Sequence, residues 1–160
     1  MKSPRGAKRP SDSYTEQVQL LNLSCLNGYG RLFGGQLMAW IDVVAATVAR
    51  RHCGCNVTTA SIDNLQFLEP AYANDAVLMT GRLTHVGKTS MEVCVKTYVE
   101  QLNGKRSLIN TAYLVMVALD KDEKPVRVPG LIPETLGERL EWEAGEKRRA
   151  LRKQRGKENY

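Results

Sequence analysis

The sequence predicts an α+β fold in which an antiparallel β-sheet wraps one long central helix. Two observations lead to this class. Residues 36–52 carry apolar side chains such as Leu37, Ile41 and Val44 at helical spacing, with no helix breaker among them. Four long runs rich in Val, Thr, Ile and Tyr follow, and only short turns separate most of them. Short links force neighbouring strands to pair antiparallel.

The expected elements follow one another along a single domain, since 160 residues suit one domain. We expect this domain to span residues 14–133, after a disordered basic start at 1–13 and before a charged C-terminal helix and tail at 134–160. Within it we expect a strand at 14–24, a glycine-rich loop at 27–35, the helix at 36–52, and strands at 56–67, 76–86, 89–99 and 105–120. A sheet with one covered face and one open face usually finds a partner, so a homo-oligomer is expected.

The net charge of +6 is concentrated at the two ends of the chain. Residues 1–9 hold four cations and no acid, and residues 147–158 hold seven cations and one acid. The remaining body is therefore net negative, which argues against a general nucleic-acid groove, although a basic tail can bind polyanions. The basic start lacks the apolar run of a secretory signal, and no segment is long and apolar enough for a membrane span, so we expect a cytoplasmic protein.

The common catalytic and metal-binding motifs are missing. The sequence has no G-x-S-x-G elbow, no H-E-x-x-H, no phosphate-binding P-loop and no dinucleotide fingerprint. Cys53-Gly54-Cys55 is a C-x-C with no second pair to match it, which favours free thiols over a zinc centre. His52 ends the long helix, where a cation suits the helix dipole.

Asp42 is the anomalous residue of the long helix. It stands among apolar residues and, at 3.6 residues per turn, shares a face with Met38 and small residues such as Ala45 and Ala46. A carboxylate there is costly to bury unless it is paired or functional. The helix alone leaves a catalytic carboxylate and a salt-bridged or flank-exposed one equally open.

The loop before the helix favours the catalytic interpretation. Gly34-Gly35 at a helix start leaves N–H groups pointing outward with the positive end of the dipole behind them, a place that stabilises an oxyanion. Asn27 adds a side-chain amide that can orient water or polarise a carbonyl. A plain glycine turn with a local Asn cap remains the alternative. From Gly35 to Asp42 the helix rises roughly 10 Å, too far for one carbonyl, so a site that uses both must combine two subunits.

The motifs of the chain resemble those of hotdog-fold acyl-CoA thioesterases, in the cytosolic acyl-CoA hydrolase branch. The resemblance rests on N-x-x-G-x-x-F-G-G-x-L-M-x-W-x-D at 27–42, A-R-R-H at 49–52, V-T-T-A-S-I-D at 57–63, F-L-E-P at 67–70 and G-K-T-S-M-E-V at 87–93. It continues through V-A-L-D at 117–120 and covers about residues 14–133. It implies a hotdog fold, a dimer as the minimal unit, and assembly to a tetramer or hexamer.

The resemblance also implies roles for particular residues. Asp42 is the catalytic carboxylate, which either activates water or attacks the thioester, and Asn27 is its polar partner across the interface. The substrate and coenzyme A are expected to contact Gly87, Lys88, Thr89, Ser90, Asn64 and Phe67. Lys88 stands where arginine is common in the family, so a two-point phosphate contact becomes a single point charge.

The function implied is hydrolysis of acyl-CoA to free coenzyme A and a carboxylic acid, without metal or cofactor, since coenzyme A is part of the substrate. The leaving thiol, with a pKa of about 8.5 if it resembles cysteine, departs without a strong acid. Two alternatives stay open. A hotdog dehydratase needs a histidine beside an acid, and neither histidine lies in such a motif. A non-catalytic module that binds acyl-CoA or polyanions leaves Asp42 unexplained.

Overall fold

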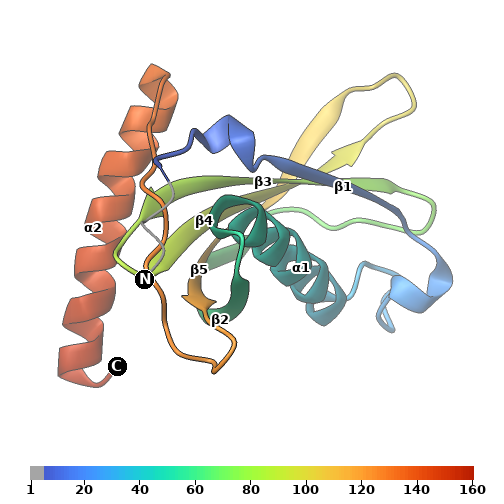
Figure 1. Cartoon of the computed structure of the whole chain (residues 1–160). Helices are drawn as coiled ribbons and strands as arrows, with labels where there is room; N and C mark the ends of the chain where they lie inside the picture. Colours follow the sequence, from blue (N-terminus) through green and yellow to red (C-terminus); the bar gives the residue numbers. More distant parts are fainter. Residues whose placement is uncertain (1–5) are drawn as a thin grey trace.

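One antiparallel sheet curves around a long helix in the computed structural model, which describes residues 6–160 (Figure 1). The five strands lie in the order β1-β3-β4-β5-β2, and every neighbouring pair is antiparallel. In chain order the elements are η1 Pro10–Asp12, β1 Thr15–Leu20, η2 Leu23–Cys25, α1 Gly34–Cys53, β2 Asn56–Phe67, β3 Ala76–Val86, β4 Ser90–Glu100, β5 Arg106–Leu119 and α2 Leu136–Glu158. The predicted α+β class with a wrapped central helix is confirmed.

The core lies between α1 and the concave face of the sheet. Leu37, Ile41, Val44 and Val48 of α1 are almost fully buried, as their helical spacing predicts. The sheet approaches α1 closely at Gly81 of β3, where a Cβ atom would lie 2.7 Å from the Cγ1 of Val44. The helix therefore packs against bare strand backbone at this point.

The second helix, α2, packs on the opposite face of the sheet near one end (Figure 1). Strand alternation explains this position, because Met91 and Val93 point into the α1 core while Glu92 between them contacts α2. Gly145 of α2 is buried, and a Cβ atom there would lie 2.7 Å from the Cβ of His85. The C-terminal segment, expected as a charged helix and tail, is one helix of 23 residues whose glycine allows close contact with the sheet.

The start of the chain differs from the disordered segment that the sequence predicts for residues 1–13. The backbone N–H of Lys8 donates to the carbonyl of Gly130 at 3.0 Å, and its Nζ donates to the carbonyl of His52 at 2.9 Å. Pro10–Asp12 form a 3₁₀ turn, and Ser13 is fully buried. Composition suggested disorder because it does not reveal these contacts with α1 and the segment after β5. Residues 1–5 lie outside the described residues.

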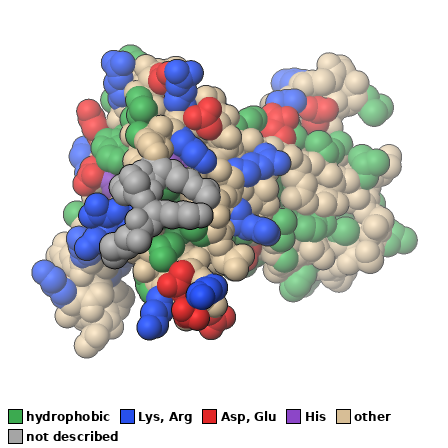
Figure 2. All heavy atoms as spheres, in the orientation of Figure 1, with side chains coloured by type: hydrophobic (Ala, Val, Ile, Leu, Met, Phe, Trp, Pro, Cys, Tyr) green, Lys and Arg blue, Asp and Glu red, His purple; other side chains and the backbone are tan. Residues whose placement is uncertain are grey.

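None of the helices in the described part of the chain is long and apolar enough to cross a membrane. Hydrophobic side chains are exposed at the end of the molecule that carries η2 and the start of α1 (Figure 2). They include Leu23, Tyr29 and Phe33, which are 79%, 90% and 56% exposed.

Candidate active site

Asp42 lies halfway along α1 on the side that faces β2, and it is half-buried. The hydroxyl of Thr59 in β2 donates a hydrogen bond of 2.6 Å to its Oδ1. The register of β2 against β5 shifts between Thr59 and Ser61, so Ala60 is an extra residue and the strand bulges beside the helix. One carboxylate oxygen is thus held by Thr59, and the other, Oδ2, makes no hydrogen bond within residues 6–160.

Asn27 is fixed by a tight turn before α1. Its Oδ1 accepts hydrogen bonds from the backbone N–H groups of Tyr29 at 2.9 Å and Arg31 at 3.2 Å. Gly30 closes the turn with a positive φ of 71°, a conformation that glycine adopts without strain. Because the side-chain oxygen is occupied, the amide N–H₂ of Asn27 is the group that can donate to a substrate; it makes no hydrogen bond within residues 6–160.

The first turn of α1 presents bare backbone. Its N-cap residue, Phe33, makes no side-chain cap hydrogen bond, so the leading N–H groups are free of the usual capping partner. A Cβ atom at Gly34 would lie 3.3 Å from the ring of Phe67, and one at Gly35 would lie 2.7 Å from the ring of Phe33. Only glycine fits between these rings and the helix start without displacing them.

A cleft of about 390 Å³ joins several predicted site residues at this end of α1. Its lining includes Asn27, Gly34 and Phe67, with apolar side chains from Leu37, Leu68 and Ile109. Asp42 does not line it. Within one chain the cleft therefore brings together Asn27, Gly34 and Phe67, whereas Gly35 is not part of its lining. The carboxylate of Asp42 lies apart from the cleft and is held by Thr59.

The segment Gly87–Ser90 forms the turn between β3 and β4, and it does not line this cleft. The N–H of Gly87 donates to the carbonyl of Ser90 at 2.8 Å, and the carbonyl of Lys88 accepts from the N–H of Val128 at 3.1 Å. The side chain of Lys88 is exposed. Asn64, on β2, has a positive φ of 53° at a second register shift of that strand, and it is also exposed.

Both histidines are engaged away from Asp42. The Nε2 of His52 lies 2.9 Å from the carbonyl oxygen of Pro129, and burial lowers the pKa of this imidazole. The Nε2 of His85 lies 2.6 Å from the Oε1 of Glu146, and its ring stacks near Trp142 at 4.3 Å. These contacts tie the helices to the rest of the molecule and give neither ring a place beside Asp42.

The four cysteines are free thiols, and Cys53, for which burial raises the pKa, contacts Cys55 at the end of α1. Among residues 6–160 no group of three or more His, Cys, Asp or Glu side chains is arranged to hold a metal ion.

Sequence reasoning missed Thr59 as a site residue. It was visible only as part of the V-T-T-A-S-I-D motif, and nothing in a run of β-branched residues distinguishes the one that reaches Asp42. The bulge at Ala60 decides that contact, and bulges leave no reliable local signal here.

Comparison with known proteins agrees with this architecture. The family model described as the thioesterase superfamily matches residues 29–104. The uncharacterized acyl-CoA thioester hydrolase YkhA of Bacillus subtilis is 46% identical over 110 residues, which cover 68% of this chain and 64% of YkhA. The cytosolic acyl coenzyme A thioester hydrolase of Rattus norvegicus is 33% identical over 141 residues, which cover 86% of this chain and 37% of that protein. The chain thus spans less than two thirds of either relative.

Solved structures match over nearly the whole chain. An acyl-CoA hydrolase of Staphylococcus aureus, in complex with butyryl coenzyme A, coenzyme A and coenzyme A disulfide, superposes with a TM-score of 0.91 at 35% identity, covering 96% of this chain and 94% of that one. An apo-hexameric acyl-CoA thioesterase gives 0.91 at 37% identity, covering 95% and 98%. The order of the elements and the match to these structures identify a hotdog fold. More narrowly, the chain belongs to the thioesterase superfamily and to its acyl-CoA hydrolases.

Proposed function

We propose that this protein hydrolyses acyl-CoA thioesters in the cytoplasm, at sites that two subunits build together. Asp42 and Thr59 of one subunit face the cleft of the other, which Asn27 and Gly34 line, with Gly35 following Gly34 at the helix start. The hydrogen bond of 2.6 Å between Thr59 and Asp42 carries this proposal, because it orients a half-buried carboxylate that is otherwise unexplained. The free thiols suit a reducing compartment, and the rat relative is named cytosolic.

The edge strand β2 supports the shared site. It is paired on one side only, to β5, and most of its 12 residues are exposed. Beside it, α1 exposes Met38 and Val43, which are 38% and 55% accessible. An open strand edge next to exposed apolar side chains is a surface that proteins normally cover. A second copy seated there would bring a second glycine-led helix start toward Asp42. Several related structures are named as hexameric, which suits assembly of such dimers.

The chemistry follows from the two parts. The Oδ2 of Asp42 removes a proton from water as the water oxygen bonds to the thioester carbonyl carbon, or it attacks that carbon itself. The carbonyl oxygen gains negative charge, which the N–H groups of Gly34 and Gly35 and the amide of Asn27 stabilise. The C–S bond then breaks, and the coenzyme A sulfur leaves as a thiolate that takes up a proton. Attack by water gives the carboxylic acid directly. Attack by Asp42 gives an acyl-aspartyl anhydride, which water hydrolyses in a second step to the carboxylic acid and free Asp42.

Related structures support the choice of residues. Three of the Staphylococcus aureus structures are variants in which an aspartate, an asparagine or a threonine is replaced by alanine. The three replaced residues are separated in that chain by the same intervals that separate Asn27, Asp42 and Thr59 here.

A panel of acyl-CoA thioesters of increasing chain length tests the proposal, with free thiol measured over time. The protein is expected to release coenzyme A, and Asp42→Asn to release it at least about a hundredfold more slowly with the fold intact. Asp122→Asn, at an exposed turn, is the matched control and should retain full turnover. Coenzyme A affinity without thiol release would favour a binding module, and normal turnover in Asp42→Asn would remove Asp42 from the reaction.

A further inference from the structure

The turn between β3 and β4 meets α2 at Gly87. A Cβ atom at Gly87 would lie 3.2 Å from both the Cζ and the Nη2 of Arg149, and 2.7 Å from the Oγ of Ser90. The guanidinium of Arg149 therefore rests directly on the bare backbone of the turn, and the glycine leaves the room that it occupies. This contact places a cation of the C-terminal helix beside the segment expected to hold the coenzyme A nucleotide.

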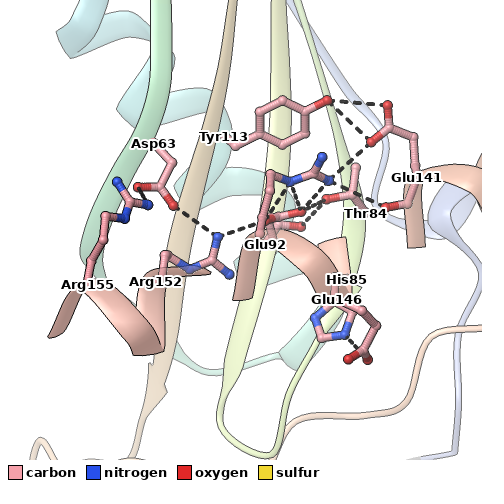
Figure 3. A network of polar contacts seen from close by, with 10 residues as sticks. Asp63, Thr84, His85, Glu92, Tyr113, Glu141, Glu146, Arg152 and Arg155 are labelled. Carbon is pink, nitrogen blue, oxygen red and sulfur yellow. Dashed lines mark hydrogen bonds and ion pairs between the residues drawn. The ribbon is translucent and has the colours of Figure 1, made fainter. Parts of the chain in front are cut away.

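Arg149 differs from Arg148 and Arg152 in forming no ion pair within the described residues, although its charge acts on Glu146 one helical turn earlier. Arg148 pairs with Glu92 at 2.8 Å. Arg152 bridges Glu92 and Asp63 at 3.0 Å each (Figure 3). Within residues 6–160, Arg149 makes no ion pair or side-chain hydrogen bond. Its charge and its donors remain available to an anion that arrives from solution.

The paired arginines fix the position from which Arg149 acts. The side chain of Glu92 is 1% exposed, and the hydroxyl of Thr84 donates to its Oε1 at 2.7 Å. Since one buried carboxylate binds two arginines a helical turn apart, α2 can neither rotate nor slide without breaking a buried pair. The close approach of Gly145 to His85 fixes the distance of the helix from the sheet.

Further positive charge lies near the same turn. Lys88 belongs to the turn itself and is exposed, and Lys153 follows Arg149 by about one helical turn. An ammonium group is a point charge, whereas a guanidinium offers a planar fork that matches two phosphate oxygens. Arg149 thus supplies the two-point contact that a lysine at position 88 cannot.

We propose that Arg149 binds a phosphate of the nucleotide end of acyl-CoA, together with the Gly87–Ser90 turn, and that the pairs of Glu92 with Arg148 and Arg152 position it there. This assignment rests on the proposed function for its substrate. It adds a residue of α2 to the coenzyme A contacts expected at the β3–β4 turn. The contact is remote from the thioester, so it acts on binding and leaves the chemical step unchanged.

Three thioesters that share one acyl group test the assignment: butyryl-CoA, butyryl-dephospho-CoA, which lacks the 3′-phosphate, and butyryl-pantetheine, which lacks the nucleotide. Arg149→Ala is expected to raise KM for butyryl-CoA about tenfold, the effect of one charge-assisted hydrogen-bonded contact, with kcat within about twofold. KM for butyryl-pantetheine should stay at the parent value. If Arg149→Ala and the parent have equal KM values for butyryl-dephospho-CoA, Arg149 contacts the 3′-phosphate. If the difference in KM between the two proteins persists with that substrate, Arg149 contacts the diphosphate.

Two further variants separate the contact from general charge. Lys147→Ala removes an exposed cation two residues away, on the other side of α2, and should leave KM unchanged. Arg149→Lys should recover part of the loss, more at low salt than at high salt. Equal KM values for butyryl-CoA in Arg149→Ala and the parent, or an equal rise with butyryl-pantetheine, would overturn the assignment.

Calorimetric titration with free coenzyme A keeps this inference distinct from the proposed hydrolysis. A parent protein that binds coenzyme A about ten times more tightly than Arg149→Ala, yet releases no thiol, would contradict hydrolysis and support the phosphate contact. Equal affinity in both proteins refutes the contact whatever the turnover.

Discussion

Recombining two inactive variants tests directly whether two subunits build each site. Asp42→Ala removes the carboxylate that Thr59 holds beside β2, and Asn27→Ala removes the amide at the cleft before α1. These groups belong to separate parts of one chain, since the helix rises roughly 10 Å between its glycine start and Asp42. Each variant alone should be inactive, or nearly so, for a different reason.

The expected recovery follows from counting sites. If the two variants are unfolded together and refolded with random pairing, about half of the dimers are mixed. Each mixed dimer has one site that takes Asp42 from one chain and Asn27 from the other, and a second site that lacks both. Recovery should therefore approach about a quarter of the parent activity, because half of the dimers carry one intact site of two.

The assay is thiol release at saturating butyryl-CoA, with the two variants carrying different affinity tags so that mixed dimers can be isolated and measured. Each variant refolded alone is the control for recovery unrelated to pairing. Mixed dimers that form but show no activity above these controls would refute the shared site, because residues from one chain cannot be restored by any pairing.

Four further outcomes are expected. In steady-state kinetics, Thr59→Val should lower kcat about tenfold to a hundredfold with little change in KM. Thr59→Ser, which keeps the hydroxyl, should have a kcat near that of the parent. A kcat in Thr59→Val equal to that of the parent would remove the hydroxyl from the mechanism. Glu92→Gln should lower the free energy of unfolding in urea by about 3 kcal/mol, because it weakens the buried ion pairs with Arg148 and Arg152. Glu143→Gln, on the exposed side of α2, should change it by less than about 0.5 kcal/mol. Equal effects of the two substitutions would contradict the argument from burial. Burial raises the pKa of Glu92, but hydrogen bonds from Arg148 and the neighbouring groups outweigh burial and hold that pKa below its ordinary value of 4.5. The stability that this carboxylate contributes above pH 4.5 should therefore be lost as the pH falls through its lowered pKa. Glu92→Gln should flatten the acid part of a plot of the urea unfolding midpoint against pH. Lys88→Ala should raise KM for acyl-CoA more than it lowers kcat. The ratio of KM in this variant to KM in the parent should decrease as the salt concentration rises. A ratio that does not change with salt would place the phosphates elsewhere.

Local sequence patterns were sufficient for the elements that build the core. The apolar spacing around Val44 predicts α1, and the structure extends that helix only from 36–52 to Gly34–Cys53. The β-branched runs predict four of the strands with small changes at their ends, as in β4, expected at 89–99 and found at Ser90–Glu100. These elements are predictable because burial on one face imposes a period that the sequence must repeat.

The rest depended on contacts between distant residues. The arginines of α2 look like a solvated charge run in the sequence, yet Arg148 and Arg152 reach a glutamate that lies inside β4. No local pattern marks Glu92, because its neighbours on the strand are apolar and its arginine partners lie more than 50 residues away. Thr59 was missed for a similar reason, since its role depends on a bulge and on a helix 17 residues earlier.

The buried glycine of α2 has a consequence for the source of this helix's stability. Glycine inside a helix costs about 1 kcal/mol relative to alanine, and α2 contains Gly137, Gly145 and Gly156 together with many like charges. A segment of this kind gains little helix in isolation and needs the finished sheet, with Glu92 in place, as its template. The C-terminal helix therefore gains much of its stability from docking on the sheet, so the contact of Arg149 with Gly87 depends on a sheet that is already in place.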